Sequence, residues 1–595
     1  MTLGGSNTAN GFSGGDYLSE ESVLRSYPLY PTRKRRCCNV AGDGFTVISA
    51  CFCIFTTALT IAFVAQLNYG SPEVTPHGAV STDEEGCSRV GITIMADGGN
   101  AVDVAVASIL CMTVVHPHAV GPGGSGVMLI HDHKTNSSTV VDFMSGVPYS
   151  HKAEEEQPSP TDGKSIGVPG LLRGLEYAHT KFGKLSWRKL FSPSIDIARK
   201  GFVVSAHLEE ALKKSNVTQV DGVTEFDKTF FPRGIMLKQG DFMQRENYAQ
   251  FLEIVAKHGA DSFYALNFGV EEINALRENG AEIYVRDLDT YEPRERPCIH
   301  MSLKNMSVFT APAPFGGPQL LAALQLLRNS NLTTHLPLSN FYHSFLEAIR
   351  RSYAGFVSLA DAEEAVLQNM TNELLSASSE WKDDRVTLAD PNIFRLPEQT
   401  ASSVSVIDTF DSYVALVAGL GTYFGSRVMT KSGILFNNHL SNMPPHTHPG
   451  DEQFSHSRPL NTYTPVIITD VHQVCGMRAV LSSPDVGAVI QVISQLLFQG
   501  HSLTEAIEQP RITVRPGLDQ VFVEDFGDID RLPGSVRNAI TTKNTLQVLH
   551  LPYPSVNGVS KTKDKLVSRS DARGGGVAHR LEPASTHTVN ITTDL

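Results

Sequence analysis

The chain has 595 residues, a net charge of −13 at pH 7, and 41% hydrophobic and 19% charged residues. This ordinary composition predicts a folded globular protein, and the length allows either several domains or one large one. The negative charge argues against a general nucleic-acid-binding protein, which needs excess Lys and Arg to neutralise phosphates.

The N-terminal part predicts a membrane anchor. Residues 1–44 are rich in Gly, Ser and Asn at their start and have no sustained apolar period, so we expect a disordered cytoplasmic tail. Residues 45–67 contain no Asp, Glu, Lys or Arg, and about 20 apolar residues suffice for a helix to cross a bilayer. The segment begins too far along the chain for an ordinary signal peptide, and the basic residues 33–36 before it favour a cytoplasmic N-terminal side. We therefore expect a single-pass type II membrane protein; a buried core helix is the alternative interpretation.

The rest of the chain is expected to lie outside the cytoplasm, as a short stem over 68–81 and an extracellular or lumenal ectodomain over 82–595. In such an ectodomain, the N-x-[ST] pattern predicts N-linked glycans. The pattern occurs at Asn136, Asn216, Asn305, Asn331, Asn369 and Asn590.

The cysteines divide by predicted compartment. Cys37 and Cys38 lie beside the basic cluster and are candidates for palmitoylation. The cysteines that follow the anchor lie in a compartment where disulfides persist. These are Cys87, Cys111, Cys298 and Cys475. The sequence leaves the pairing of Cys298 and Cys475 open, because their separation in space cannot be read from it.

A glycine-rich segment, residues 121–126, lies between a predicted helix that ends at Val115 and an apolar strand over 127–130. It has the glycines of a phosphate-binding loop but precedes a strand rather than a helix, and it lacks the P-loop Lys. A tight turn is the better interpretation.

The segment from residue 399 to residue 443 predicts a β-hairpin and carries two distinctive blocks. Two β-rich runs are separated by a turn at 408–411, and the blocks 423–426 and 432–438 follow. These blocks resemble the segment that opens the small subunit of the γ-glutamyltransferases (glutathione hydrolases). Those enzymes are N-terminal-nucleophile hydrolases that cut their own chain before a threonine.

Further matches follow in the order of that family and run from about residue 78 to about residue 576. They include residues 97–103, 121–126, 165–170, 182–187, 195–202, 287–288, 342–343, 508–511 and 571–574. Within the family, residues 43–48 and 124–132 are most similar to the glutathione hydrolase 7 type. Helix and strand signals alternate along the chain, which by itself indicates an α/β or α+β protein.

The resemblance implies a four-layer αββα N-terminal-nucleophile hydrolase sandwich, with a large-subunit part to residue 399 and a small-subunit part over 400–595. It also implies a Cys87–Cys111 disulfide, no cofactor, and glutathione or another γ-glutamyl compound as the substrate of an active enzyme. No protein partner can be named from the sequence.

The chemistry of this family needs a hydroxyl nucleophile at a new N-terminus, whose own amine acts as the base. Thr400 is the candidate, but counting back from residues 423–426 without gaps places Ala401 at the nucleophile position. A one-residue slip in a strand reverses the direction of every side chain. Thr400 is therefore either the nucleophile, with one residue inserted after it, or an ordinary threonine at the start of a strand.

Other positions of the family's site carry different residues here. Gly419 and Gly421 stand at the places of a hydroxyl and an amide, and Met144 stands where the family has a substrate-binding arginine, with no Arg close by in the sequence. The acidic positions that hold the substrate ammonium carry His439 and Asn442.

The remaining two sites of the family motif also differ. Asn461 and Thr462 replace paired serines and retain hydrogen-bonding groups. Residues 481–486 contain no Gly-Gly pair, Pro484 lacks an N–H, and Asp485 brings a negative charge toward a developing anion. We therefore assign no oxyanion donor.

Three functions remain open. The favoured one is a fold of this family that has lost γ-glutamyl chemistry and has a binding or regulatory role, through a pocket near Asn461, Thr462 and His439. The second is an active hydrolase or transpeptidase that uses Thr400, and the third is an enzyme for an amide substrate without an α-carboxylate. Loop histidines without the spacing of a structural zinc site predict no metal; they are His116, His118, His446, His448 and His456.

Overall fold

The computed structural model describes residues 44–69, 78–149 and 158–594, the last range with internal gaps, of which the longest are 379–393, 444–456 and 525–533. Helix α1 (Gly44–Tyr69) agrees with the predicted anchor and is long and apolar enough to cross a membrane. The predicted tail, Cys37 and Cys38 lie outside the described residues.

The ectodomain contains an eight-stranded sheet whose centre is the predicted hairpin. Its strand order is β19-β18-β1-β9-β10-β2-β3-β6. The strands are β1 (Gly78–Thr82), β2 (Ser125–Asp132), β3 (Ser137–Phe143), β6 (Arg294–Pro297), β9 (Thr400–Ile407), β10 (Ser412–Gly421), β18 (Ala578–Glu582) and β19 (Asn590–Asp594). Strand β1 is fully buried, so the sheet begins within the segment expected as a stem.

A second sheet of six strands has the order β17-β16-β12-β11-β8-β7. Its strands are β7 (Ile299–Leu303), β8 (Met306–Thr310), β11 (Thr464–Asp470), β12 (Met477–Ser483), β16 (Asn557–Thr562) and β17 (Lys565–Arg569). Two smaller sheets join β4 (Phe202–Val203) with β5 (Phe242–Met243), and β13 (Ile512–Val514), β14 (Gln520–Glu524) and β15 (Thr545–Leu549).

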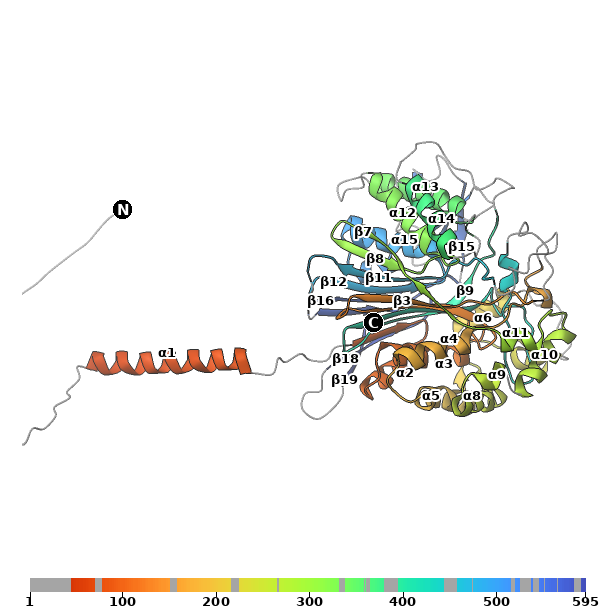
Figure 1. Cartoon of the computed structure of the whole chain (residues 1–595), viewed down its shortest axis with the longest axis horizontal. Helices are drawn as coiled ribbons and strands as arrows, with labels where there is room; N and C mark the ends of the chain where they lie inside the picture. Colours follow the sequence, from red (N-terminus) through yellow and green to blue (C-terminus); the bar gives the residue numbers. More distant parts are fainter. Residues whose placement is uncertain are drawn as a thin grey trace, which may run out of the picture. The chain divides into compact units, whose positions relative to one another are not determined.

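Helices cover the outer face of each large sheet, as Figure 1 shows. The eight-stranded sheet is covered by α2 (Glu85–Ala96), α3 (Ala101–Val115), α4 (Leu171–Phe182), α5 (Trp187–Lys200) and α8 (Glu246–His258). The six-stranded sheet is covered by α12 (Gly317–Asn329), α13 (Leu338–Phe356), α14 (Glu364–Ala377), α15 (Val486–Ser494) and α16 (Leu503–Glu508). Smaller helices complete the first side: α6 (Ala206–Lys214), α7 (Glu225–Phe230), α9 (Asp261–Tyr264), α10 (Asn267–Glu278) and α11 (Val285–Asp289). The predicted four-layer αββα sandwich is confirmed.

Strand β9 separates two cores because its side chains alternate between the faces of the sheet. Val404 and Val406 pack into the core beneath the first helices. Ala401 and Ile407 belong to the core between the two sheets. The start of β9 therefore lies where the helix layer, the eight-stranded sheet and the core between the two sheets meet.

The implied disulfide is present between Cys87 on α2 and Cys111 on α3. It joins two helices in which every second or third residue is small or apolar, so they pack closely. Cys298 and Cys475, whose pairing the sequence left open, are both free.

Three predicted glycosylation sites lie on exposed residues: Asn136 between β2 and β3, Asn305 between β7 and β8, and Asn369 on α14. Asn216 and Asn331 lie outside the described residues, and only the backbone of Asn590 is described, at the start of β19. Glycosylation itself stays a prediction.

Candidate active site

The hairpin β9–β10 places Ala401 opposite Gly419 and Thr400 opposite Gly421. Pairing is regular from Tyr413 to Gly419, and the register shifts only between Gly419 and Gly421. The irregularity therefore lies in β10, beyond the partner of Ala401, and not between residues 401 and 419.

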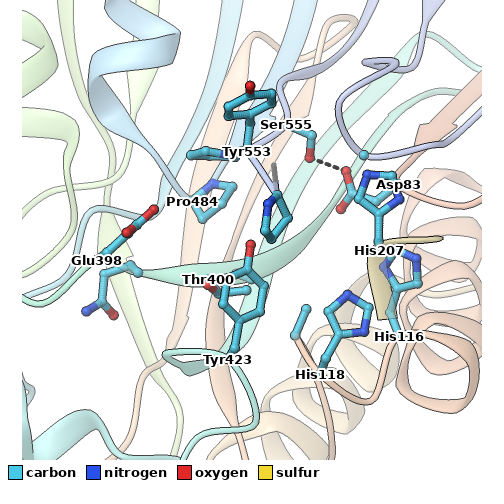
Figure 2. A pocket seen from close by; sticks show the side chains of 16 residues that line it. Asp83, His116, His118, His207, Glu398, Thr400, Tyr423, Pro484, Tyr553 and Ser555 are labelled. Atoms are coloured by element: carbon cyan, nitrogen blue, oxygen red, sulfur yellow. Dashed lines mark hydrogen bonds between the residues drawn. The ribbon is translucent and has the colours of Figure 1, made fainter. Parts of the chain in front are cut away.

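Thr400 and Ala401 both line a cavity of about 40 Å³. Figure 2 shows the side chains around it, which come from both ends of the chain: Asp83, His116, His118, His207, Tyr423 and Ser555 surround Thr400. The hydroxyl of Tyr423 lies close to the Thr400 side chain. Pockets that bind small molecules usually measure about 300–1,000 Å³, so this cavity is too small for a tripeptide.

Asp83 is a buried acid of this cavity that the sequence reading missed. Its carboxylate accepts hydrogen bonds from Ser403 N at 2.8 Å, from Asn557 Nδ2 at 2.6 Å and from Ser555 Oγ. Burial raises its pKa to about 6. An Asp directly after the short strand formed by residues 78–82 was the available signal.

Three histidines line the same cavity. The rings of His116 and His118 lie 4.8 Å apart, and His207 Nε2 hydrogen-bonds the carbonyl of Arg573. Burial lowers the pKa of His116 to about 3 and lowers the pKa values of His118 and His207 as well. In the part of the chain that the structure describes, no group of three or more His, Cys, Asp or Glu could hold a metal; His446, His448 and His456 lie outside that part.

On the inter-sheet side, Tyr463 occupies the space next to β9. Its hydroxyl lies 3.5 Å from the carbonyl oxygen of Thr400 and 3.3 Å from His439 Nε2. It also hydrogen-bonds the backbone of Gly421. A Cβ atom at Gly419 would lie 2.5 Å from this hydroxyl, so the missing side chain at Gly419 and the presence of Tyr463 are linked.

His439 is fully buried behind Tyr463, and burial lowers its pKa to about 3. Its Nδ1 lies 2.9 Å from Ser145 Oγ and 3.2 Å from Ser125 Oγ. Both ring nitrogens thus have hydroxyl partners, and the neutral ring cannot supply the charge that an acidic residue would give.

The other predicted substrate contacts are engaged within the protein. Asn442 and Gln399 exchange two amide hydrogen bonds of 3.1 Å. Asn461 Oδ1 accepts from Tyr463 N at 3.0 Å, and Thr462 Oγ1 donates to the carbonyl of Pro484 at 2.6 Å. His439 hydrogen-bonds Tyr463, whose hydroxyl lies near the Thr400 carbonyl. Asn442 hydrogen-bonds Gln399, the residue before Thr400. Of the predicted contacts, these two therefore approach Thr400 indirectly.

Met144 is fully buried in the inter-sheet core. An arginine distant in sequence does approach it, because Arg458 Nη1 donates to the Met144 carbonyl. That guanidinium also donates to Glu292 O at 2.8 Å and lies 4.6 Å from the centre of the Tyr291 ring. Arg458 Nε also lies 4.0 Å from Asp142 Oδ2. Arg458 therefore binds backbone, ring and carboxylate groups of the protein itself.

The N-terminus of α15 lies at the end of the stretch 481–486, in which oxyanion donors were expected. Asp485 caps this helix, and its Oδ1 accepts from Gly487 N at 2.8 Å and from Ala488 N at 3.4 Å. Asp485 N donates to Ser483 Oγ at 3.1 Å. These donors already have acceptors.

The family model for gamma-glutamyltranspeptidase matches residues 87–581 of this chain. The chain belongs to the gamma-glutamyltranspeptidase family.

Curated relatives include glutathione hydrolase 7 of Homo sapiens, which is 28% identical over 524 residues, covering 83% of this chain and 79% of the relative. The glutathione hydrolase 5 proenzyme of Rattus norvegicus is 29% identical over 479 residues, covering 74% and 82%. The predicted family and its glutathione hydrolase 7 likeness are confirmed. Among solved structures, cephalosporin acylase from Bacillus halodurans has the same fold, with a TM-score of 0.71, 19% identity and coverage of 84% and 95%.

Two stretches that matched the gamma-glutamyltranspeptidase family meet in space. Arg511, in the stretch 508–511, forms a buried ion pair with Asp571, in the stretch 571–574. The Asp571 carboxylate also accepts from Val556 N at 2.8 Å and from Arg573. These residues stabilise the packing between the second sheet and its helices. They do not line the Thr400 cavity.

Proposed function

We propose that this protein is a membrane-anchored member of the gamma-glutamyltranspeptidase family that has lost efficient γ-glutamyl cleavage and functions by binding. Its relatives are named as hydrolases of glutathione, so the proposal is a departure from the family's activity. It places α1 as a type II anchor, with the ectodomain outside the cytoplasm.

The observation that carries the proposal is the position of Tyr463. Its ring is fully buried between the sheets, and its hydroxyl contacts the Thr400 carbonyl and the Gly421 backbone. A γ-glutamyl group that reacted at the start of β9 would need that space. The cavity that Thr400 lines on the other side of the strand measures only about 40 Å³.

The state of the candidate oxyanion donors supports the same conclusion. Loss of one such donor costs about 10²–10³ in rate. Within the expected stretch 481–486, Asp485 N already donates to Ser483 Oγ and Pro484 has no N–H. A carboxylate at that place also repels an oxyanion.

The alternative is an active glutathione hydrolase or transpeptidase that cuts its own chain before Thr400. The contact between Thr400 and Tyr423 favours it, because both hydroxyls line one cavity together with the buried acid Asp83 and three histidines. Asp83 or a neutral histidine could then accept a proton.

The test is the size of the full chain on a denaturing gel after expression in a secretory host and removal of N-glycans, next to a Thr400→Ala variant. We expect one intact chain for both proteins and no glutamate release from glutathione. Two fragments from the wild type only, with the smaller beginning at Thr400, would overturn the proposal and establish the alternative.

A further inference from the structure

A second, larger cavity of about 300 Å³ lies beside the Thr400 cavity. The two share Glu398, Gln399, Pro484 and Pro554 in their walls. The larger one is bounded by α12, α13, the start of α15 and the strands β13 and β14. Its volume is at the lower end of the range for small-molecule pockets.

Most of the wall is apolar. Ile349, Val486, Ile512 and Val514 are each buried side chains that line it. Tyr353 holds the wall formed by residues 394–396, because its hydroxyl donates to Phe394 O at 3.0 Å and accepts from Leu396 N at 3.1 Å. An apolar body of a ligand would find contact on several sides.

Gln319 is the unsatisfied polar group of this wall. Its side chain lines the cavity, is 2% exposed, and its Oε1 has no hydrogen-bond partner among the described residues. Buried polar groups are nearly always hydrogen-bonded in folded proteins. A buried amide without a partner at the edge of a cavity therefore indicates a ligand that supplies one.

Two carboxylates of the wall each keep one oxygen without a hydrogen bond to the described part of the chain. Asp485 uses Oδ1 to cap α15, which leaves Oδ2. Glu524 accepts from Arg573 Nε through Oε2, which leaves Oε1. Burial raises the pKa of both groups.

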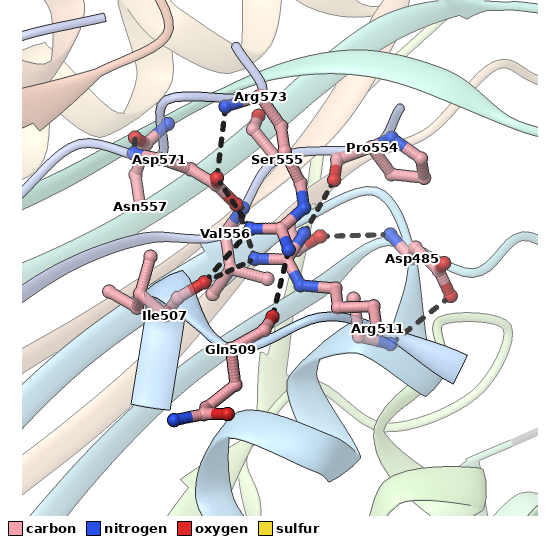
Figure 3. Close-up of polar contacts among 12 residues, drawn as sticks. Asp485, Ile507, Gln509, Arg511, Pro554, Ser555, Val556, Asn557, Asp571 and Arg573 are labelled. Atoms are coloured by element: carbon pink, nitrogen blue, oxygen red, sulfur yellow. Dashed lines mark hydrogen bonds and ion pairs between the residues drawn. The ribbon is translucent and has the colours of Figure 1, made fainter. Parts of the chain in front are cut away.

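The cations near the cavity are already neutralised. Figure 3 shows Arg511 and Arg573 among their partners. Arg511 pairs with Asp571 and donates to Pro554 O at 2.7 Å, and Arg573 pairs with Asp571 and Glu524. With Asp485 added, three carboxylates face two guanidinium groups, so a negative charge remains. A ligand cation is favoured over a ligand carboxylate, because the charge of Arg511 is already balanced by Asp571, although Arg511 Nε has no hydrogen-bond partner among the described residues.

We propose that this cavity binds a small amine that has an apolar body, one positive charge and no carboxylate. Its ammonium group donates to Asp485, Glu524 and Gln319, and its body packs against the apolar wall. The site goes beyond the proposed loss of γ-glutamyl chemistry and does not depend on whether Thr400 reacts.

The test is calorimetric titration of the full chain in detergent with 2-phenylethylamine. The matched probes are 2-phenylethanol, which has no charge, and phenylalanine, which adds a carboxylate. We expect saturable binding of the amine, with each matched probe weaker by about tenfold or more. Equal binding of the alcohol or of phenylalanine, or no saturable binding of the amine, would overturn the proposal.

Two variants locate the binding. Asp485→Asn keeps an N-cap residue for α15 but removes the charge, and Gln319→Met removes an amide that has no protein partner. Each variant should bind the amine with about tenfold lower affinity. The control is Asp470→Asn, because Asp470 also accepts backbone hydrogen bonds, from His472 N and Gln473 N, but lies outside the cavity. Affinity that is unchanged in both cavity variants would refute the site, even if the wild type binds the amine.

Discussion

The hydroxyl oxygen of Tyr463 lies 2.5 Å from the place that a Cβ atom at Gly419 would take. A side chain at residue 419 and a tyrosine at residue 463 therefore exclude each other. The carbonyl of Thr400 is also 2.5 Å from that place, so the backbone of β9 closes the space from another side. The absence of a side chain at residue 419 and the position of the Tyr463 ring are therefore structurally coupled.

Replacing Gly419 by Ala should destabilise the protein. The added methyl group meets backbone as well as the Tyr463 hydroxyl, and overpacking of this kind costs about 1–3 kcal/mol. The measurement is the free energy of unfolding in urea. Gly121→Ala is the control, because its Cβ would find nothing closer than 3.7 Å; equal stability of the two variants would contradict the expected clash.

Placing a threonine in the gapless register should not restore self-cleavage. In Ala401→Thr the hydroxyl gains no oxyanion donor, because Asp485 N still donates to Ser483 Oγ and Tyr463 still fills the inter-sheet space. We expect an intact chain on a denaturing gel after prolonged incubation. A fragment that begins at position 401 would show that the nucleophile alone was missing. The double variant with Asp485→Gly then tests whether freeing the donors helps.

The order of the elements could be predicted because it depends on local patterns and on motifs in sequence order. The hairpin around 408–411, the anchor helix and the implied disulfide needed only such information. The side chains that make up the site could not be predicted, because they depend on which residues the two stacked sheets bring together. Tyr463 follows directly after Asn461 and Thr462 in the chain, yet only the stacking of the second sheet on the first places its ring beside β9.

The partners of charged side chains were equally hard to predict from the sequence. The sequence predicts that Asp485 brings a negative charge toward an oxyanion, and this stays a prediction. That it caps α15 and thereby uses the donors follows only from the helix start at Val486. Arg458 shows the converse, since it reaches the Met144 carbonyl from 314 positions away.

Removing the disulfide should lower stability. The link spans 24 residues between α2 and α3, and a disulfide of this loop length contributes about 3 kcal/mol by restricting the unfolded chain. The variant Cys87→Ala/Cys111→Ala is compared in urea with Cys298→Ala, which removes a free thiol. A loss of stability in the second variant equal to that in the first would contradict the assignment.

Exposed sequons should carry glycans if the ectodomain faces the secretory lumen. Asn136 and Asn305 lie in turns between strands, where an enzyme can reach them. Each change to Gln should raise the mobility of the chain on a gel by one glycan step. Mobility that is the same before and after enzymatic deglycosylation of the wild type would contradict the type II orientation.

Acid should destabilise the protein partly through His439. Burial lowers the pKa of this histidine from 6.5 to about 3 in the folded state, so between these values the unfolded chain binds more protons. Stability from the neutral ring is complete above about pH 6.5 and is lost as the pH falls, by up to about 1.4 kcal/mol per pH unit.

His439→Gln removes this titration, so the stability difference between wild type and variant should shrink on going from about pH 7 to about pH 4.5. The measurement is the free energy of unfolding in urea at each pH, with His300→Gln, an exposed position on β7, as the control. A difference between wild type and His439→Gln that stays constant with pH would mean that the ring is not held neutral. Comparing the variants at each pH is necessary because Asp83, whose pKa is raised to about 6, acts in the opposite direction over part of the same range.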